Sequence, residues 1–188
     1  MSKRYTESVT QFRTGNGTDW LDFLSTEVGR YRATQRDLLA DPAALRAWFA
    51  ERGLEPVAAV GAADLENART LREALHRITR ATLFDEQPAR ADLRLLQDAL
   101  SADQPLRIRA GSLRVERPAD ASVALGRLAR QAVGDLTGPN RERLHACGDN
   151  TCAGFFLDLT GRRRWCTDER CGVRLRVAAH RARQRGAG

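Results

Sequence analysis

The sequence predicts an α+β protein: a mainly helical N-terminal domain with one small β-hairpin, followed by a small treble-clef-like module of a knuckle, a β-hairpin and a helix. Three observations support this fold class. Apolar side chains recur at helical spacing through most of the chain up to residue 140. All four cysteines of the 188-residue chain lie between positions 147 and 171. The helical pattern breaks near Gly138-Pro139, between these two parts.

We expect three segments. Residues 1–17 are polar, contain Gly15 and Gly17, and are predicted to be a flexible N-terminus. Residues 18–138 form the helical domain, and residues 141–188 form the cysteine-containing module with a basic C-terminal helix. The uncharged stretches are too short for a transmembrane helix, and the polar start lacks the apolar segment of a secretory signal. These features are typical of a cytoplasmic protein.

Two helices are predicted at the start of the helical domain. The first begins at Thr18 or Asp19, either of which can be the N-cap, and its apolar side extends to Val28. The second begins at Asp41-Pro42, because Asp is a good N-cap and Pro fits the first helical position. Its buried stripe and its glycine stop are Leu45, Trp48, Phe49 and Gly53.

The longest helix is predicted from about Ala63 to Leu83. Its apolar face consists of Leu65, Ala68, Leu71, Leu75, Ile78 and Thr82. The charged residues between them, including Arg72, are expected to form a solvated face. His76 has no partner cysteine or second histidine at nearby positions, so we expect a structural or surface role for it.

Two further helices flank a predicted β-hairpin. Pro88 begins the first helix, and Asp120 caps the second. Between them, residues 106–109 and 113–116 alternate apolar and charged side chains around Ala110-Gly111, which is typical of a hairpin. The domain lacks a phosphate-binding glycine loop, a nucleophile elbow and a paired-carboxylate motif, so we do not expect an enzyme.

The four cysteines have the spacing of a metal site. Four residues separate Cys147 from Cys152, thirteen separate the two pairs, and four separate Cys166 from Cys171. Two close pairs joined by a spacer can supply the corners of a tetrahedron, and soft thiolates favour zinc over magnesium or calcium. Because four thiolates leave no open position, we expect one structural Zn²⁺ ion.

Three other roles of the cysteines are less consistent with the sequence. Two disulfides require an oxidising compartment, and nothing in the sequence indicates export. A redox switch that releases zinc has no positive sign in the sequence. An iron–sulfur cluster normally uses different cysteine spacings.

The spacer between the cysteine pairs is predicted to form a hairpin. Residues 155–159 alternate like a strand, Thr160-Gly161 forms the turn, and residues 162–165 return as the partner strand. Trp165 is adjacent to the third cysteine and is expected to cover the metal.

Residues 172–184 contain no proline and are predicted to form a helix directly after the last cysteine. Val173 and Val177 lie one turn apart, and we expect them to pack on the hairpin.

Basic charge is concentrated in the last quarter of the chain. The whole chain has a net charge of +7, whereas residues 141–188 contain eleven arginines and only five acidic residues. Such asymmetry indicates a polyanionic partner, and guanidinium groups suit phosphate oxygens and guanine edges. A solvated basic helix in an arginine-rich protein is the alternative. The candidate nucleic-acid-binding residues are Arg162, Arg163, Arg164, Arg174, Arg176, Arg181, Arg183 and Arg185.

The C-terminal module resembles the CGNR zinc finger family, and the helical domain resembles the ABATE domain that is often found ahead of that finger. The finger resemblance rests on Arg143 to Cys147, Cys152, Phe156-Leu157-Asp158, Arg162 to Cys166, and Cys171 to Arg174. The ABATE resemblance rests on Leu21-Asp22-Phe23, Leu38 to Pro42, Leu45 with Trp48, and Leu71 to Leu75. Together the two resemblances cover nearly the whole chain.

The resemblance implies a bacterial stress-response or transcriptional regulator whose finger binds DNA. Where the motif that names the family has Asn, this chain has Val173, which cannot make the hydrogen bonds of that Asn. No cysteine is lost, so zinc binding is expected to persist, as is phosphate binding by the arginines.

We therefore expect a zinc-dependent, double-stranded-DNA-binding regulator in the cytoplasm, associated with the nucleoid. Its N-terminal domain is expected to sense a small-molecule effector or to mediate homodimer formation. Two alternatives remain open at this stage: an RNA-binding protein, and a zinc-stabilised adaptor for other proteins.

Overall fold

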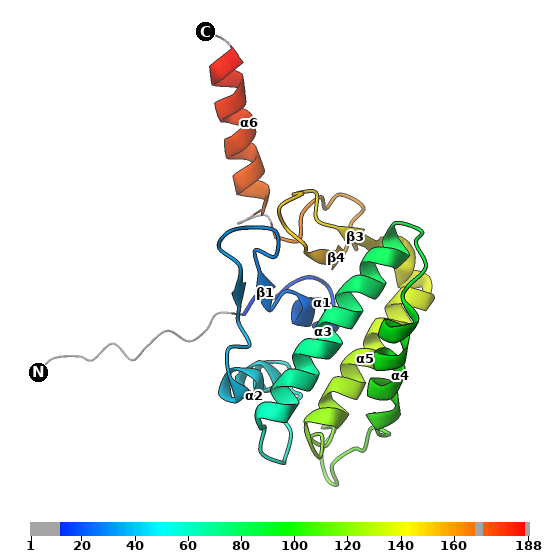
Figure 1. The fold of residues 1–188 in the computed structure, drawn as a ribbon. Helices are drawn as coiled ribbons and strands as arrows, with labels where there is room; N and C mark the ends of the chain where they lie inside the picture. Colours follow the sequence, from blue (N-terminus) through cyan, green and yellow to red (C-terminus); the bar gives the residue numbers. More distant parts are fainter. Residues whose placement is uncertain (1–11, 168–170, 187–188) are drawn as a thin grey trace, which may run out of the picture.

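The computed structural model describes residues 12–167 and 171–186, in which a helical body carries a small β-containing lobe and a projecting C-terminal helix (Figure 1). The helices are α1 (Asp19–Leu24), α2 (Pro42–Glu51), α3 (Ala62–Leu83), α4 (Arg90–Ala102), α5 (Ala121–Thr137), the 3₁₀ helix η1 (Pro139–Arg143) and α6 (Val173–Gly186). Two antiparallel pairs of strands complete the fold: β1 (Glu27–Val28) with β2 (Arg36–Asp37), and β3 (Leu144–Ala146) with β4 (Phe155–Leu157). The predicted fold class is confirmed. Within the described part of the chain, no helix is long and apolar enough to cross a membrane.

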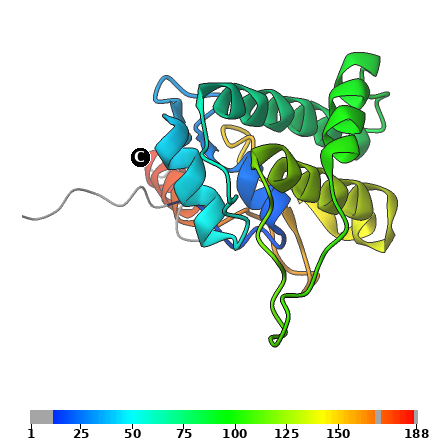
Figure 2. The same cartoon turned by 90° about the horizontal axis from the view of Figure 1, so that it is seen from below.

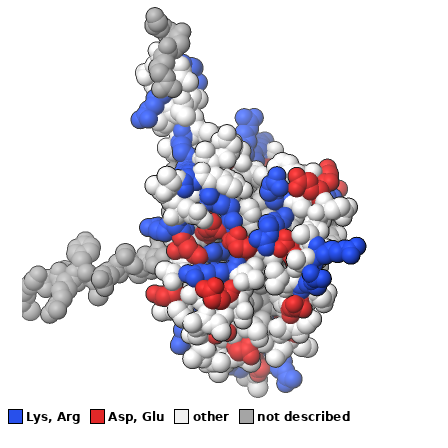
Figure 3. Space-filling model, viewed as in Figure 1, with Lys and Arg blue, Asp and Glu red and all other residues white. Residues whose placement is uncertain are grey.

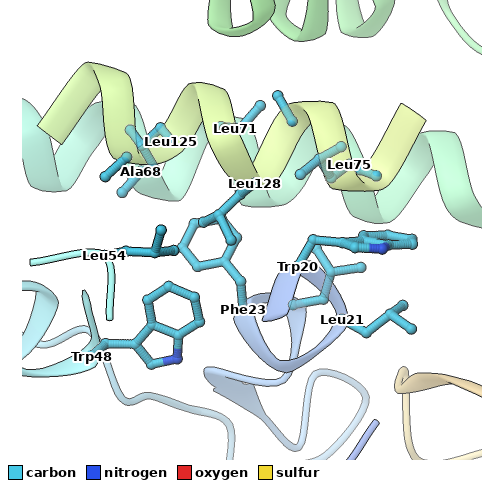
Figure 4. Packing of buried hydrophobic residues seen from close by; sticks show 14 of the residues in the cluster. Trp20, Leu21, Phe23, Trp48, Leu54, Ala68, Leu71, Leu75, Leu125 and Leu128 are labelled. Carbon is cyan, nitrogen blue, oxygen red and sulfur yellow. The ribbon is translucent and has the colours of Figure 1, made fainter. Parts of the chain in front are cut away.

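The core lies where α3, α4 and α5 pack together and α1 and α2 cover one end (Figure 4). Trp20, Phe23 and Trp48 are fully buried there, and the rings of Phe23 and Trp48 lie 5.2 Å apart. The indole N–H of Trp20 donates to Oδ2 of Asp135 on α5 at 2.6 Å, which satisfies its only polar group. Residues distant in sequence thus share one apolar centre.

Two predicted helix starts are confirmed by their capping bonds. The Asp41 carboxylate accepts from the backbone N–H of Ala44 at 2.7 Å, and the Asp120 carboxylate accepts from that of Val123 at 3.0 Å. Each bond satisfies an N–H that lacks a partner within its helix. Pro88 precedes α4 by two residues, so that predicted start is correct within the usual uncertainty of a helix boundary.

Two predictions for the first half of the chain are wrong. The first helix ends at Leu24, and Val28 lies in β1 instead of continuing the helical face. Arg72 is buried, not solvated, because its guanidinium donates to both carboxylate oxygens of Asp37, at 2.7 and 2.8 Å. A buried charge of this kind requires such a partner.

The packed region begins before residue 18. Phe12 joins the apolar core, and Asn16 is buried with its amide hydrogen-bonded to Asp22 at 2.8 Å and to Ser25 at 3.0 Å. These residues differ from the expectation of a flexible N-terminus. Residues 1–11 of that predicted segment lie outside the described residues.

The β-containing lobe shares the core of the helical body. Leu144 and Leu157 belong to the same buried cluster as the helices, and the backbone N–H of Leu157 donates to the Asn16 carbonyl at 2.8 Å. A Cβ on Gly17, whose φ is +113°, would lie 2.8 Å from Cβ of Leu157. The chain therefore needs glycine here for both its backbone angle and its close approach.

Gly126 lies inside α5, where glycine ordinarily weakens a helix. A Cβ at this position would lie 2.7 Å from the backbone nitrogen of Asp103 and 2.9 Å from the Ala99 carbonyl oxygen. The end of α4 can thus approach α5 only because this side chain is absent.

We expect Gly126→Ala to destabilise the protein by roughly 1–3 kcal/mol, because backbone atoms cannot move aside as a flexible side chain does. Gly134→Ala in the same helix is the matched control, because nothing lies within 4 Å of the added Cβ. It should stabilise the protein by roughly 0.5–1 kcal/mol through helix propensity. Urea unfolding followed by circular dichroism measures both, and equal effects of the two changes would contradict this interpretation.

Candidate metal centre

Four cysteine thiols meet at one point of the lobe. The Sγ atoms of Cys147, Cys152, Cys166 and Cys171 all lie within 4.8 Å of one another. The Sγ atoms of Cys152 and Cys166 are 3.6 Å apart, and those of Cys166 and Cys171 are 3.7 Å apart. A tetrahedral zinc ion with Zn–S bonds of about 2.3 Å requires sulfur–sulfur edges of about 3.8 Å. The cluster therefore fits one zinc ion, and the predicted cofactor is confirmed.

The ionisation of these thiols is mutually opposed when they stand this close. The side-chain hydrogen bond with Cys152 lowers the pKa of Cys147, whereas the side-chain hydrogen bond with Cys147 raises the pKa of Cys166. All four thiols can become thiolates together only if a cation supplies the compensating charge. Four sulfur ligands fill a tetrahedron and leave no open position, which is the chemistry of a structural site.

The hairpin that presents the first cysteine pair differs from the prediction. β4 pairs with β3, with Phe156 opposite His145, and residues 162–165 form no strand. The backbone N–H of Cys147 donates to the Gly154 carbonyl at 2.8 Å, which closes the knuckle between the first two ligands. A carbonyl in the 162–165 segment, that of Arg164, accepts from the N–H of Gly148 at 2.9 Å. The second cysteine pair is thus brought back by isolated backbone bonds instead of a strand.

An aspartate in the turn before the lobe's second pair fixes that return. One Asp158 oxygen accepts from the N–H groups of Thr160 and Gly161, and the other accepts from that of Arg163, all at 2.9 Å. An Asx-type turn of this kind organises the loop without a sheet.

Asp149, inside the knuckle, is the supporting residue that sequence reasoning missed. Its buried carboxylate accepts from Nε of Arg174 at 2.7 Å and also from Nη2 of that residue. Burial opposes ionisation, but hydrogen bonds from Thr151 and Arg174 hold the pKa of Asp149 below its ordinary value. The Asp-x-Thr sequence, typical of an Asx turn, is the signal that could have identified it.

Arg174 couples the knuckle to the projecting helix. Its Nη2 lies 3.3 Å from Sγ of Cys171 while it is paired with Asp149. The guanidinium therefore supplies positive charge and an N–H donor to a thiolate that carries negative charge toward the zinc ion. This contact fixes the first turn of α6 relative to the metal.

Small and aromatic residues enclose the sulfur cluster. A Cβ on Gly154 would lie 3.2 Å from Sγ of Cys166 and 3.3 Å from Sγ of Cys152, so glycine leaves room for the sulfurs. Trp165 packs against the cluster as expected. Nε2 of His76, on α3, lies 3.0 Å from the Ala153 carbonyl oxygen, and its ring lies 4.9 Å from that of Phe155.

His76 therefore has the structural role that the sequence predicts. Burial lowers its pKa to about 4, so the imidazole is neutral and its N–H donates to the Ala153 carbonyl. The long helix of the body is thereby hydrogen-bonded to the loop between two zinc ligands.

The candidate arginines occupy two kinds of position. Arg163 is engaged within the protein: Nη1 donates to the Gly15 carbonyl at 2.8 Å, and the guanidinium lies 4.6 Å from the centre of the Phe156 ring. Arg174 is likewise engaged with Asp149. The others whose side chains are described are exposed: Arg162, Arg164, Arg176, Arg181 and Arg183. The side chain of Arg185 lies outside the described part.

Helix α6 extends away from the body with basic groups along it (Figures 1 and 3). Its sequence contains five arginines and no acidic residue. Val173 and Val177 are 44% and 42% exposed, so the prediction that they pack on the hairpin is wrong. The zinc cluster and Arg174 hold only the start of this helix, and the rest has no apolar surface of the lobe to cover it. The guanidinium of Arg176 lies 5.8 Å from the Trp165 ring centre.

Comparison with protein families agrees with both resemblances noted in the sequence. Residues 17–139 match the ABATE family, described as a putative stress-induced transcription regulator. Residues 143–184 match the CGNR zinc finger. Among curated proteins, none matches the chain. The family descriptions are those of regulators and zinc fingers, not of enzymes.

We expect Arg174→Gln to weaken zinc binding by about 10- to 100-fold, because it removes the N–H donor and positive charge beside the Cys171 thiolate. Competition with a chromophoric chelator measures the affinity. Arg181→Gln removes the same charge from the same helix farther from the sulfurs and should leave the affinity unchanged. Equal affinities of the two variants would contradict a supporting role for Arg174.

Proposed function

This chain belongs to the ABATE family and carries a CGNR zinc finger, and from that premise we propose that it is a zinc-dependent, DNA-binding transcription regulator acting on the nucleoid in the cytoplasm. The observation that carries the proposal is α6, a 14-residue helix with five arginines and no acidic residue, anchored at one end beside the zinc site. Such a helix is about 21 Å long, and the major groove of B-DNA admits an α-helix.

The proposal assigns the arginines two roles. Arg162 and Arg164 on the loop, with Arg176, Arg181 and Arg183 on α6, contact the phosphates of duplex DNA. Arg185, at the end of the same helix, is proposed as a further contact on the strength of its sequence position. Arg163 and Arg174 act from within, because their guanidinium groups hold the loop and the first turn of α6 in place. Exposed guanidinium groups on a rigid support bind phosphate without a cost for ordering the helix.

Val173 occupies the exposed first turn of α6, where the family motif has Asn. A valine side chain cannot donate or accept a hydrogen bond, so we assign no base-specific polar contact to this position. Affinity from phosphate contacts does not depend on it.

The proposed division of labour places the boundary near Gly138-Pro139. Residues 18–138 sense a small-molecule effector or mediate dimerisation, and residues 141–188 contact DNA. The four cysteine ligands, Cys147, Cys152, Cys166 and Cys171, belong to the DNA-binding part. Because both parts share one apolar core, a change in the body has a direct physical path to the finger.

Fluorescence anisotropy with a labelled duplex across a salt series tests this proposal. The zinc-loaded wild-type chain should bind, with log affinity falling linearly as log salt rises. Arg181→Ala with Arg183→Ala should weaken binding and reduce the magnitude of the salt slope by about 2, because two phosphate contacts are lost.

Arg90→Ala with Arg94→Ala is the matched control, since it removes two exposed arginines from α4. This control should bind as the wild type does. Equal weakening of both double variants, or no binding at low salt, would overturn the proposal. Preferential binding of a structured RNA competitor would favour the RNA-binding alternative instead.

A further inference from the structure

The connection between α4 and α5 extends away from the helices as a two-stranded ribbon (Figure 2). We refer to its residues 106–116 as the arm. Ile108 and Val115 form an antiparallel bridge, flanked by hydrogen bonds from Arg109 N–H to the Arg114 carbonyl and from Glu116 N–H to the Arg107 carbonyl, both 2.8 Å long. The predicted hairpin is therefore present.

The arm carries an uncovered apolar face. Residues two apart on a strand share a face, so Leu113 and Leu106 lie on the same side as the bridged pair. Leu113 is 95% exposed, and Leu106, Ile108 and Val115 are 51%, 56% and 46% exposed. An alternating pattern of this kind normally rests on a core, and within the described part of the chain nothing covers it. The apolar face therefore has the composition of a buried surface that a partner must complete.

The base of the arm is fixed, while its tip is free. The backbone N–H groups of Val57 and Ala58 donate to the carbonyls of Pro118 and Ala119, both at 2.9 Å. The guanidinium of Arg117 donates to the Pro56 carbonyl at 2.7 Å. A rigid base sets the direction of the arm, so ordering it on binding costs little conformational entropy.

A groove of complementary character lies beside this base. It has a volume of about 310 Å³ and runs between α3, α4 and α5, bounded by Ala102 at the end of α4 and Ser122 at the start of α5. Its floor is apolar and consists of Leu71, Leu95, Ala99 and Leu125. Its rim carries the carboxylates of Asp64 and Asp98.

The charges of the two surfaces are opposite. Arg107, Arg109 and Arg114 are exposed on the charged side of the arm and form no ion pair within the described residues. Asp98 on the groove rim is also exposed and is not in an ion pair of the described structure. An apolar strip flanked by guanidinium groups thus matches an apolar floor flanked by carboxylates, which favours association and sets its register.

We propose that the arm inserts into the groove of a second copy of this chain and that the second copy returns the same contact. Arm and groove lie at the same end of the body, because residues 102 and 122 border both. A two-fold axis through that end makes the exchange reciprocal and closed, as in most homodimers. The inference deepens the dimerisation role proposed for the helical body.

Analytical ultracentrifugation of the zinc-loaded full chain without DNA tests the exchange. The wild type should be a dimer, and Leu113→Asp should weaken dimerisation at least about tenfold by placing a charge on the apolar floor beside its carboxylate rim. Leu159→Asp makes the same change at a leucine that is 66% exposed on the lobe and should remain dimeric.

A photoreactive amino acid at position 113 identifies the surface that the arm contacts. Mixing isotopically light and heavy chains should give cross-links between copies that map to residues 95–102 or 122–125. A wild type that stays monomeric up to about 100 μM, a Leu113→Asp variant that dimerises normally, or cross-links outside the groove would overturn the inference. Because no DNA is present, such a failure leaves the DNA-binding proposal standing.

Discussion

The arrangement of this protein depends on the attraction between four thiolates and one divalent ion. The lobe that contains them has short strands of only three residues, so little apolar surface of its own could hold it together. Zinc binding joins the knuckle, the return loop and the start of α6, and it supplies folding free energy to the lobe. Arg174 transmits this constraint to the basic helix through its contacts with Cys171 and Asp149.

The second constraint is the core that the lobe shares with the helical body. Leu144 and Leu157 pack into the helical cluster, and His76 on α3 is hydrogen-bonded to the loop between two zinc ligands. A finger attached in this way cannot reorient independently of the body. The geometry therefore suits a regulator in which an event in the helical part, such as the association of two copies, positions the basic helices.

Local signals in the sequence predicted more than long-range ones did. Caps at Asp41 and Asp120 depend on residues three positions away, and the cysteine spacing reflects a single metal geometry, so both could be predicted. The burial of Arg72 could not, because its partner is 35 residues distant. The pairing of β3 with β4 was missed for a similar reason: strands of three residues are too short to show an alternating pattern, and one of them lies before the first cysteine. Runs of arginine likewise do not reveal that Arg163 turns inward.

The central claim is that zinc holds the arginine-bearing helix in the geometry that binds DNA. Duplex affinity measured as a function of zinc occupancy, with a chelator removing the ion and added zinc restoring it, tests this claim most directly. We predict that affinity falls in parallel with bound zinc and recovers when zinc is returned. A zinc-free chain that binds the duplex as tightly, with the same salt dependence, would contradict the account.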